Sequence, residues 1–131
     1  MIDWSKYPNF KESEFRCKCC GEALMDEKHL NSLQHLRKMM NIPLVISSGY
    51  RCPQHNQTVS SSGLTGPHTT GKAVDILIYG EGAFRLLTTA IGMKAFMGIG
   101  IKQSGPHLSR FIHLDSIYAD PINKRPALWT Y

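Results

Sequence analysis

The sequence lacks a long apolar run and a leader-like beginning. No stretch of its 131 residues approaches the roughly 18 apolar residues that a membrane-spanning helix needs. The first residues, Met1 to Lys6, lack the basic stretch and the apolar core of a secretory signal peptide. We therefore expect neither membrane insertion nor a signal peptide.

Acidic residues are missing from the centre of the chain. Between Lys28 and Val74 there are five Lys or Arg and no Asp or Glu, and the whole chain has a formal charge of +5. A basic surface suits a polyanion such as nucleic acid or an anionic cell wall, although it can also serve solubility alone. Because no run of Lys and Arg is longer than two residues, we expect no nucleic acid partner.

The length leaves room for one domain. We predict a single domain over residues 1–131, with an irregular, cysteine-containing N-terminal arm over about residues 1–23. Apolar spacing and capping residues predict helices from Asp26 to Asn41, over 53–59 and over about 81–95. Short apolar runs predict strands at 44–46, 73–78, 98–101 and 111–115, followed by an irregular tail over 121–131. The fold class is therefore α+β, with a small sheet that is at least partly antiparallel.

Three ionisable residues stand out, because two of them interrupt apolar strands. Asp75 lies within Ala-Val-Asp-Ile-Leu-Ile and His113 within Phe-Ile-His-Leu, while His68 ends a Gly- and Ser-rich loop seven residues before Asp75. A carboxylate or imidazole in such a setting is costly unless it is paired or binds a cation. Two His and one Asp form the protein ligand set of a catalytic zinc ion, with water as the fourth ligand.

Other interpretations of these three residues remain open at this point. A strand Asp is often a salt-bridge partner, and a strand His is often a satisfied core residue. Two His and one carboxylate also form the facial triad of non-haem iron enzymes. The spacing of seven residues between His68 and Asp75 disfavours iron, because the first His and the carboxylate of that triad usually lie closer together.

A longer series of motifs supports the zinc interpretation. In chain order they are Ser-Gly-Tyr-Arg-Cys-Pro-Gln-His-Asn at 48–56, His-Thr-Thr-Gly-Lys-Ala-Val-Asp-Ile at 68–76, Gly-Ile-Gly-Ile at 98–101, Phe-Ile-His-Leu-Asp at 111–115 and Arg-Pro-Ala-Leu-Trp at 125–129. From about residue 9 to the C-terminus, this order resembles the zinc D-Ala-D-Ala carboxypeptidase family. It is most similar to the short, single-domain branch that includes phage endolysin peptidases. The resemblance implies a small antiparallel sheet flanked by helices, as in hedgehog domains and D-Ala-D-Ala peptidases.

The resemblance also implies a site and a substrate. His68, Asp75 and His113 resemble the zinc ligands, and Arg51 resembles the arginine that faces the substrate. A guanidinium in this loop can bind a peptide carboxylate or polarise the scissile carbonyl, whereas the alternative is an ordinary surface salt bridge. The implied function is hydrolysis of peptidoglycan stem peptides by a carboxypeptidase or endopeptidase. We expect a monomeric phage-type lysin that reaches the bacterial wall from the host cytoplasm or the virion.

The sequence departs from the family where the catalytic base usually lies. Relatives carry a His or an acid two or three residues before the last His ligand, whereas this chain has Phe111 and Arg110, which cannot accept a proton at neutral pH. We predict His107 as the general acid/base, with an exposed loop histidine as the alternative. Asp115 follows His113 by two residues on the same side of a strand, so it is either a base or a carboxylate that holds a ligand. The departure also leaves a second function open, a zinc-containing cell-wall binding or structural module without catalysis.

The four cysteines are Cys17, Cys19, Cys20 and Cys52. Their number permits two disulfides, free thiols or a second, structural zinc ion, and Cys17 and Cys20 have the Cys-x2-Cys spacing of zinc sites. Adjacent Cys19 and Cys20 fit one tetrahedral ion poorly. We expect at least one link, through a disulfide or a metal, between the N-terminal arm and the loop that carries Arg51.

Overall fold

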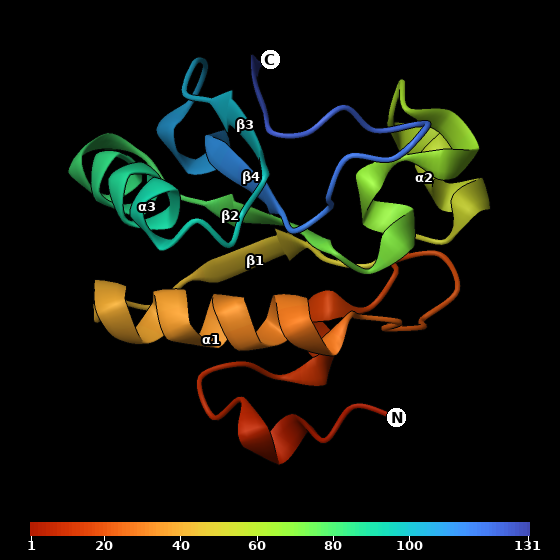
Figure 1. Cartoon of the computed structure of the whole chain (residues 1–131), viewed down its shortest axis with the longest axis horizontal. Helices are drawn as coiled ribbons and strands as arrows, with labels where there is room; N and C mark the ends of the chain where they lie inside the picture. The colour runs from red at the N-terminus through yellow and green to blue at the C-terminus, as the bar shows by residue number, and fades with distance from the viewer.

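A computed structural model describes all 131 residues, in which helices and strands alternate as far as the third strand and two further strands follow. In chain order they are α1 (Glu27–Met40), β1 (Val45–Ser48), α2 (Pro53–Val59), β2 (Ala73–Leu77), α3 (Gly80–Met93), β3 (Gly98–Lys102), β4 (Phe111–Asp115) and β5 (Ala127–Thr130) (Figure 1). The three helices and four of the strands lie where the sequence predicts them. None of the helices combines the length and the apolar character needed to cross a membrane.

The strands form one sheet in the order β1-β2-β4-β3-β5. The first four strands pair antiparallel, whereas β5 pairs parallel with β3, so the α+β prediction is confirmed with a mixed sheet. The prediction of an irregular tail was wrong, because Ala127–Thr130 forms the strand β5. This strand is hard to predict because it is short and its partner β3 lies about 30 residues earlier in the chain. Local propensity cannot report a long-range pairing of this kind.

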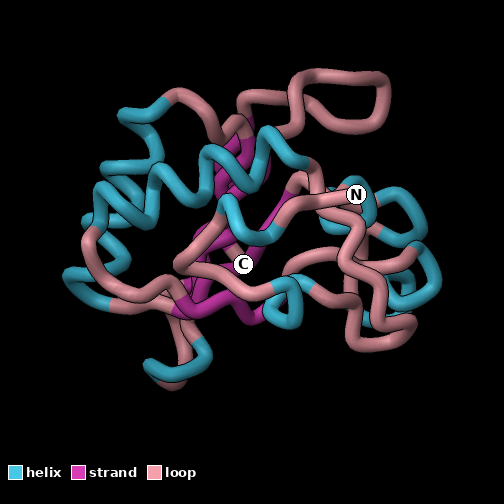
Figure 2. Tube along the Cα trace, turned by 90° about the horizontal axis from the view of Figure 1, so that it is seen from below, coloured by secondary structure: helices cyan, strands magenta, loops and turns pink.

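The apolar face of the sheet packs against two helices. Asp26 caps α1 by accepting a hydrogen bond from the backbone N–H of His29, and Leu30, Leu33 and Leu36 on the buried side of α1 are fully enclosed. Leu86 of α3 is equally buried in the same core cluster. Figure 2, seen from the side of α1, shows this helix crossing over the strands.

Alternation along the strands separates this core from a polar face. Val74 and Ile76 of β2 and Leu114 of β4 belong to the apolar core, and they alternate with Asp75 and His113. Because successive side chains of a strand point to opposite faces, the polar residues gather on the face away from the core. The register places Asp75 directly opposite His113.

The N-terminal arm contributes to the core. It contains short 3₁₀ turns at Trp4–Lys6 and Glu12–Phe15, and it buries Tyr7, Phe10 and Phe15. The carbonyl of Phe15 accepts a hydrogen bond from the N–H of Tyr50 at 2.9 Å. The arm is thus attached to the loop that follows β1, next to Arg51.

The polar face is closely packed at Gly98, and a substitution there can test this packing. Gly98 lies opposite Asp115 in the sheet, and a Cβ atom at Gly98 would collide with the Asp115 carboxylate. We expect Gly98→Ala to lower the free energy of unfolding by about 1–3 kcal/mol, the usual cost of overpacking. Urea denaturation measures this change.

Gly92→Ala is the matched control, because Gly92 lies in α3 and a Cβ atom there meets nothing within 4 Å. Alanine is the better helix former, so this variant should be as stable as the wild type or more stable. Equal stability of Gly98→Ala and the wild type would contradict the close packing of Asp115.

Candidate metal centre

His68, Asp75 and His113 converge on the polar face of the sheet. The Nε2 atom of His68 lies 3.3 Å from Oδ1 of Asp75, and Nδ1 of His113 lies 3.0 Å from the same oxygen. All three side chains are buried, and one potential ligand atom from each lies within 4.8 Å of the others. The structure therefore brings together the three residues that the sequence singles out.

The loop before β2 fixes the orientation of His68. Pro67 begins the short 3₁₀ turn Pro67–Thr70, and Gly71 ends it in the left-handed region with a φ of 73°. The Nδ1 atom of His68 donates a hydrogen bond to the carbonyl of Gly49 at 2.7 Å. This bond selects the tautomer in which Nε2 presents a lone pair towards Asp75, as a metal ligand requires.

His113 lies between two carboxylates. Its Nδ1 is 3.0 Å from Oδ1 of Asp75 and its Nε2 is 2.9 Å from Oδ2 of Asp115. Burial lowers the pKa of His113, but the hydrogen bonds to Asp115 and Asp75 outweigh it and raise this pKa above its ordinary value. Only the imidazolium can donate from both nitrogens, so a metal ion bound at Nδ1 must displace a proton.

Asp75 interacts with cations through both of its oxygens. Oδ1 faces the two histidines, while Oδ2 accepts a hydrogen bond from Nη2 of Arg51 at 3.3 Å. Burial raises the pKa of Asp75, but its interactions with His113 and His68 outweigh it and hold this pKa well below its usual range. The carboxylate is therefore ionised at any pH at which the histidines can bind a metal.

Arg51 is held on three sides. Its Nε donates to Oγ of Ser48 at 3.0 Å and its Nη1 to Oδ1 of Asn56 at 3.1 Å, besides the contact with Asp75. The guanidinium thus lies beside the ligand candidates in a fixed position. It is not an ordinary surface salt bridge, because its acidic partner is one of the three converging residues.

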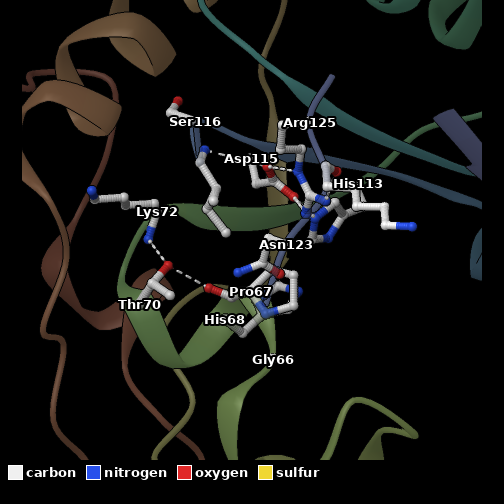
Figure 3. Close-up of polar contacts among 12 residues, drawn as sticks. Gly66, Pro67, His68, Thr70, Lys72, His113, Asp115, Ser116, Asn123 and Arg125 are labelled. Carbon is white, nitrogen blue, oxygen red and sulfur yellow. Dashed lines mark hydrogen bonds and ion pairs between the residues drawn. The ribbon is translucent and has the colours of Figure 1, made fainter. Parts of the chain in front are cut away.

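Asp115 holds the far side of His113. Arg125 donates to both carboxylate oxygens of Asp115, at 2.9 Å from Nε and 2.7 Å from Nη2 (Figure 3). The side chain of Asp115 has no exposed surface, so it cannot reach water or substrate. Of the two roles predicted for Asp115, the geometry suits the carboxylate that holds a ligand.

Sequence reasoning missed Arg125. The guanidinium of Arg125 lies 5.3 Å from the ring centre of Trp129, which in turn lies 5.1 Å from the His113 ring. The signal that could have identified Arg125 is charge balance. A buried Asp115 requires a cation, and His113 cannot serve as its only partner because Asp75 shares the same histidine.

The structure does not bring His107 to this cluster. Its ring stacks on Tyr79 at 4.9 Å, and it lines a different, more apolar pocket together with Ile42 and Leu108. The reason is topological: His107 precedes β4, and the start of β4 pairs with Leu77 at the end of β2 away from Ala73. The placement gives no support to the predicted acid/base role of His107.

A cleft of about 630 Å³ opens over the three ligand candidates. Its walls include the Ser60–Ser62 loop, Lys102, Trp129 and Tyr131. A second hollow of about 710 Å³, which contains Arg16 and Lys18, shares Arg51 and Asp75 with the cleft. The two hollows are therefore neighbours, with Arg51 and Asp75 between them, and together they are called the groove below.

The donor set matches zinc. Two imidazole nitrogens and one carboxylate oxygen are ligands that tetrahedral Zn²⁺ accepts, and a side of the cluster faces the cleft, where water or substrate can complete the coordination. The hydrogen bonds from His68 to a carbonyl and from His113 to a carboxylate are typical of zinc-binding histidines.

Comparison with known proteins gives one finding. The model of the family described as Peptidase M15 matches residues 8–115, a range that contains His68, Asp75, His113, Arg51 and all four cysteines. No curated protein and no solved structure matches the chain. Arg125, Trp129 and β5 lie beyond the matched range.

The pair of carboxylates around His113 predicts how zinc affinity depends on pH. Because the pKa of His113 is raised, protons should compete with zinc from above the ordinary histidine pKa of about 6.5, and affinity should fall as the pH falls through that region. Asp115→Asn removes one cause of the raised pKa, so the decline should begin at a lower pH. The variant should also bind zinc roughly 10–100-fold more weakly at pH 8. Competition with a chromophoric chelator between pH 6 and pH 8 measures both effects.

Glu81→Gln is the control for this experiment, because Glu81 is an exposed acid in the first turn of α3. It should leave the affinity and its pH profile unchanged. If Asp115→Asn and the wild type have the same profile, Asp115 does not control the protonation of His113.

Proposed function

The chain belongs to the peptidase M15 family, and on that premise we propose that it is a zinc-dependent peptidase that hydrolyses the stem peptides of bacterial peptidoglycan. One observation carries the proposal: His68, Asp75 and His113 offer ligand atoms within 4.8 Å of one another at the floor of an open cleft. We include both carboxypeptidase and endopeptidase activity, since the groove continues on both sides of Asp75.

Zinc would be held by Nε2 of His68, Nδ1 of His113 and a carboxylate oxygen of Asp75. When bound, the ion supplies Lewis-acid chemistry and lowers the pKa of a water molecule to about 7. Asp115 and Arg125 keep the His113 ring in position through its other nitrogen. This arrangement leaves the cleft side of the cluster for the scissile peptide group.

We propose that Arg51 binds the substrate beside the metal. Its guanidinium is partly exposed in the groove, and its bonds to Ser48 and Asn56 hold it there when a substrate approaches. Lys18 and Arg16 line one side of the groove, where Glu14 also lies, and Lys102 lies on the other side. Stem peptides carry free carboxylates, so these cations provide electrostatic complementarity to the substrate.

Proton delivery to the leaving amine needs a group other than Asp115, which is sealed from the cleft. Tyr131 lines the cleft, and burial together with the negative charge of Asp75 raises the pKa of its phenol above the ordinary value. A phenol with the ordinary pKa of about 10 is already protonated at neutral pH, so this hydroxyl is available as a hydrogen-bond and proton donor. We propose Tyr131 as the general acid in place of His107.

The lysin assignment and its route to the wall are also part of the proposal. The similarity of the motifs to phage endolysin peptidases favours a phage-type enzyme that reaches peptidoglycan from the host cytoplasm or the virion. A single copy of the chain carries the three ligand candidates and Arg51, which is consistent with action as a monomer.

A second candidate function is a zinc-containing wall-binding module without catalysis. The observation that favours it is the lack of a usual base: Arg110 and Phe111 occupy those positions, and Asp75 is the only carboxylate among the cleft-lining residues. The two functions differ in a measurable way, since a binding module retains affinity for sacculi but releases no peptide fragments.

Digestion of purified sacculi tests the proposed function. The zinc-loaded wild type should release products that mass spectrometry assigns to cleavage of one bond in the stem peptide. His68→Ala and His113→Ala should lose zinc and at least 10³-fold of the turnover, because each removes a ligand to the catalytic ion. Binding of the wild type to sacculi without any product would refute the peptidase and favour the wall-binding module.

Tyr131→Phe tests the proposed proton donor. General acid catalysis typically contributes about 10²–10⁴-fold, so we expect turnover to fall by that order while zinc content and Tm stay at wild-type values. His107→Ala is the matched control and should leave turnover unchanged, because His107 lies in another pocket. A large loss in His107→Ala with full activity in Tyr131→Phe would reverse the assignment.

A further inference from the structure

Three of the four cysteines meet at a second place in the fold. The sulfur atoms of Cys17, Cys20 and Cys52 lie within 4.8 Å of one another, although Cys52 is separated from the other two by more than 30 residues. Cys17 and Cys52 are buried, and Cys20 is exposed. The N-terminal arm supplies two of these thiols, and the residue just before α2 supplies the third.

The chain folds tightly around the sulfur of Cys17. The N–H of Gly21 donates to the carbonyl of Cys17 at 2.9 Å, and Gly21 has a φ of 78°, which a residue with a side chain would adopt only with strain. The N–H of Cys17 donates to the carbonyl of Glu22 at 2.7 Å and closes the turn. This turn brings Cys20 back towards Cys17.

A backbone N–H group points at the same sulfur. The N–H of Cys52 donates a hydrogen bond to Sγ of Cys17, with 3.3 Å between the nitrogen and the sulfur. A donor directed at a sulfur stabilises the thiolate, which is the form that binds metals.

We propose that Cys17, Cys20 and Cys52 bind a zinc ion at a structural site separate from the candidate catalytic centre. Sulfur atoms around a tetrahedral zinc lie about 3.8 Å apart, given a Zn–S distance of about 2.3 Å, so the observed separation needs only small side-chain movements. The exposed Cys19 is not among the three cysteines whose sulfur atoms lie together, and Cys20, which is, lies at the surface of the protein.

A disulfide accounts for fewer of these observations. It would join two of the three sulfurs and leave the third unpaired in the same place, and a disulfide sulfur does not need N–H donors. A metal ion uses all three sulfurs together and neutralises the thiolates.

The site would connect the arm to the loop that positions Arg51. Arg51 immediately precedes Cys52, and Tyr50 is already bonded to Phe15 of the arm. An ion bound by Cys17, Cys20 and Cys52 would therefore fix both sides of this loop. Its loss should disturb Arg51 without removing any ligand of the catalytic centre.

Zinc release by a thiol-specific mercurial tests the proposal on the intact chain. We expect the wild type to contain two zinc ions, one of which is released as the thiols are modified. His113→Ala should contain one zinc ion, and the mercurial should release it. Because this variant lacks a catalytic ligand, the result stands whether or not the chain is a peptidase.

Substitutions identify the ligands. Cys52→Ser should reduce the zinc content from two to one and lower activity on sacculi, whereas Cys19→Ser, the matched control, should keep both ions. No mercurial-releasable zinc in the wild type, or a mass decrease that reveals a disulfide, would overturn the proposal. Equal loss of the ion in Cys19→Ser would overturn the assignment to three thiolates.

Discussion

A row of alternating charges on one face of the sheet is the constraint on which the rest of the structure depends. Arg51, Asp75, His113, Asp115 and Arg125 follow one another, each within 3.3 Å of the next. Removing one partner of such a buried pair leaves an uncompensated charge, at a cost of about 3–5 kcal/mol. Each member is therefore stabilised by an oppositely charged neighbour. An arginine forms each end of the row.

This face of the sheet needs residues without side chains beside the row, so that the charged groups have space. Gly98 leaves space for the Asp115 carboxylate and Gly100 leaves space for Trp129, while the opposite face of the same strands is filled with Ile and Leu. The two-residue period of a strand therefore gives a chain of 131 residues both a core and a site without a second layer of helices. The arm then closes the core beneath α1 and the loop that carries Arg51.

The ligand candidates could be predicted from sequence because they violate a pattern. Asp75 and His113 interrupt apolar strands, and an ionisable residue in such a place requires a partner whatever the fold is. Helices were predictable for a related reason, since Leu30, Leu33 and Leu36 repeat at helical spacing between a capping Asp26 and a terminal Asn41 in the left-handed region.

The remaining features depend on contacts between distant residues. The partner of Asp115 is Arg125, which lies in a tail without a helical or strand pattern. The strand β5 forms because it can pair with the edge of β3. Proximity in sequence favoured His107, but the 3₁₀ turn that contains it leads to the far end of β4. His107 and His113 are close in sequence, but a strand rises by about 3.3 Å per residue, so the two side chains lie far apart.

The charges of the row explain why the centre suits a cation and a negatively charged group at once. Asp75 and Asp115 contribute two negative charges, Arg51 and Arg125 two positive ones, so the four cancel and the proton on His113 leaves the set at +1. A divalent ion that displaces this proton would raise the total to +2, and burial of these side chains limits how far water screens that charge. That positive charge is directed into the cleft beside Arg51, where an approaching carboxylate or the developing negative charge of a cleaved amide would be stabilised. The charge of Asp115 is already part of this total, and its bond to Arg125 confines this carboxylate to holding His113.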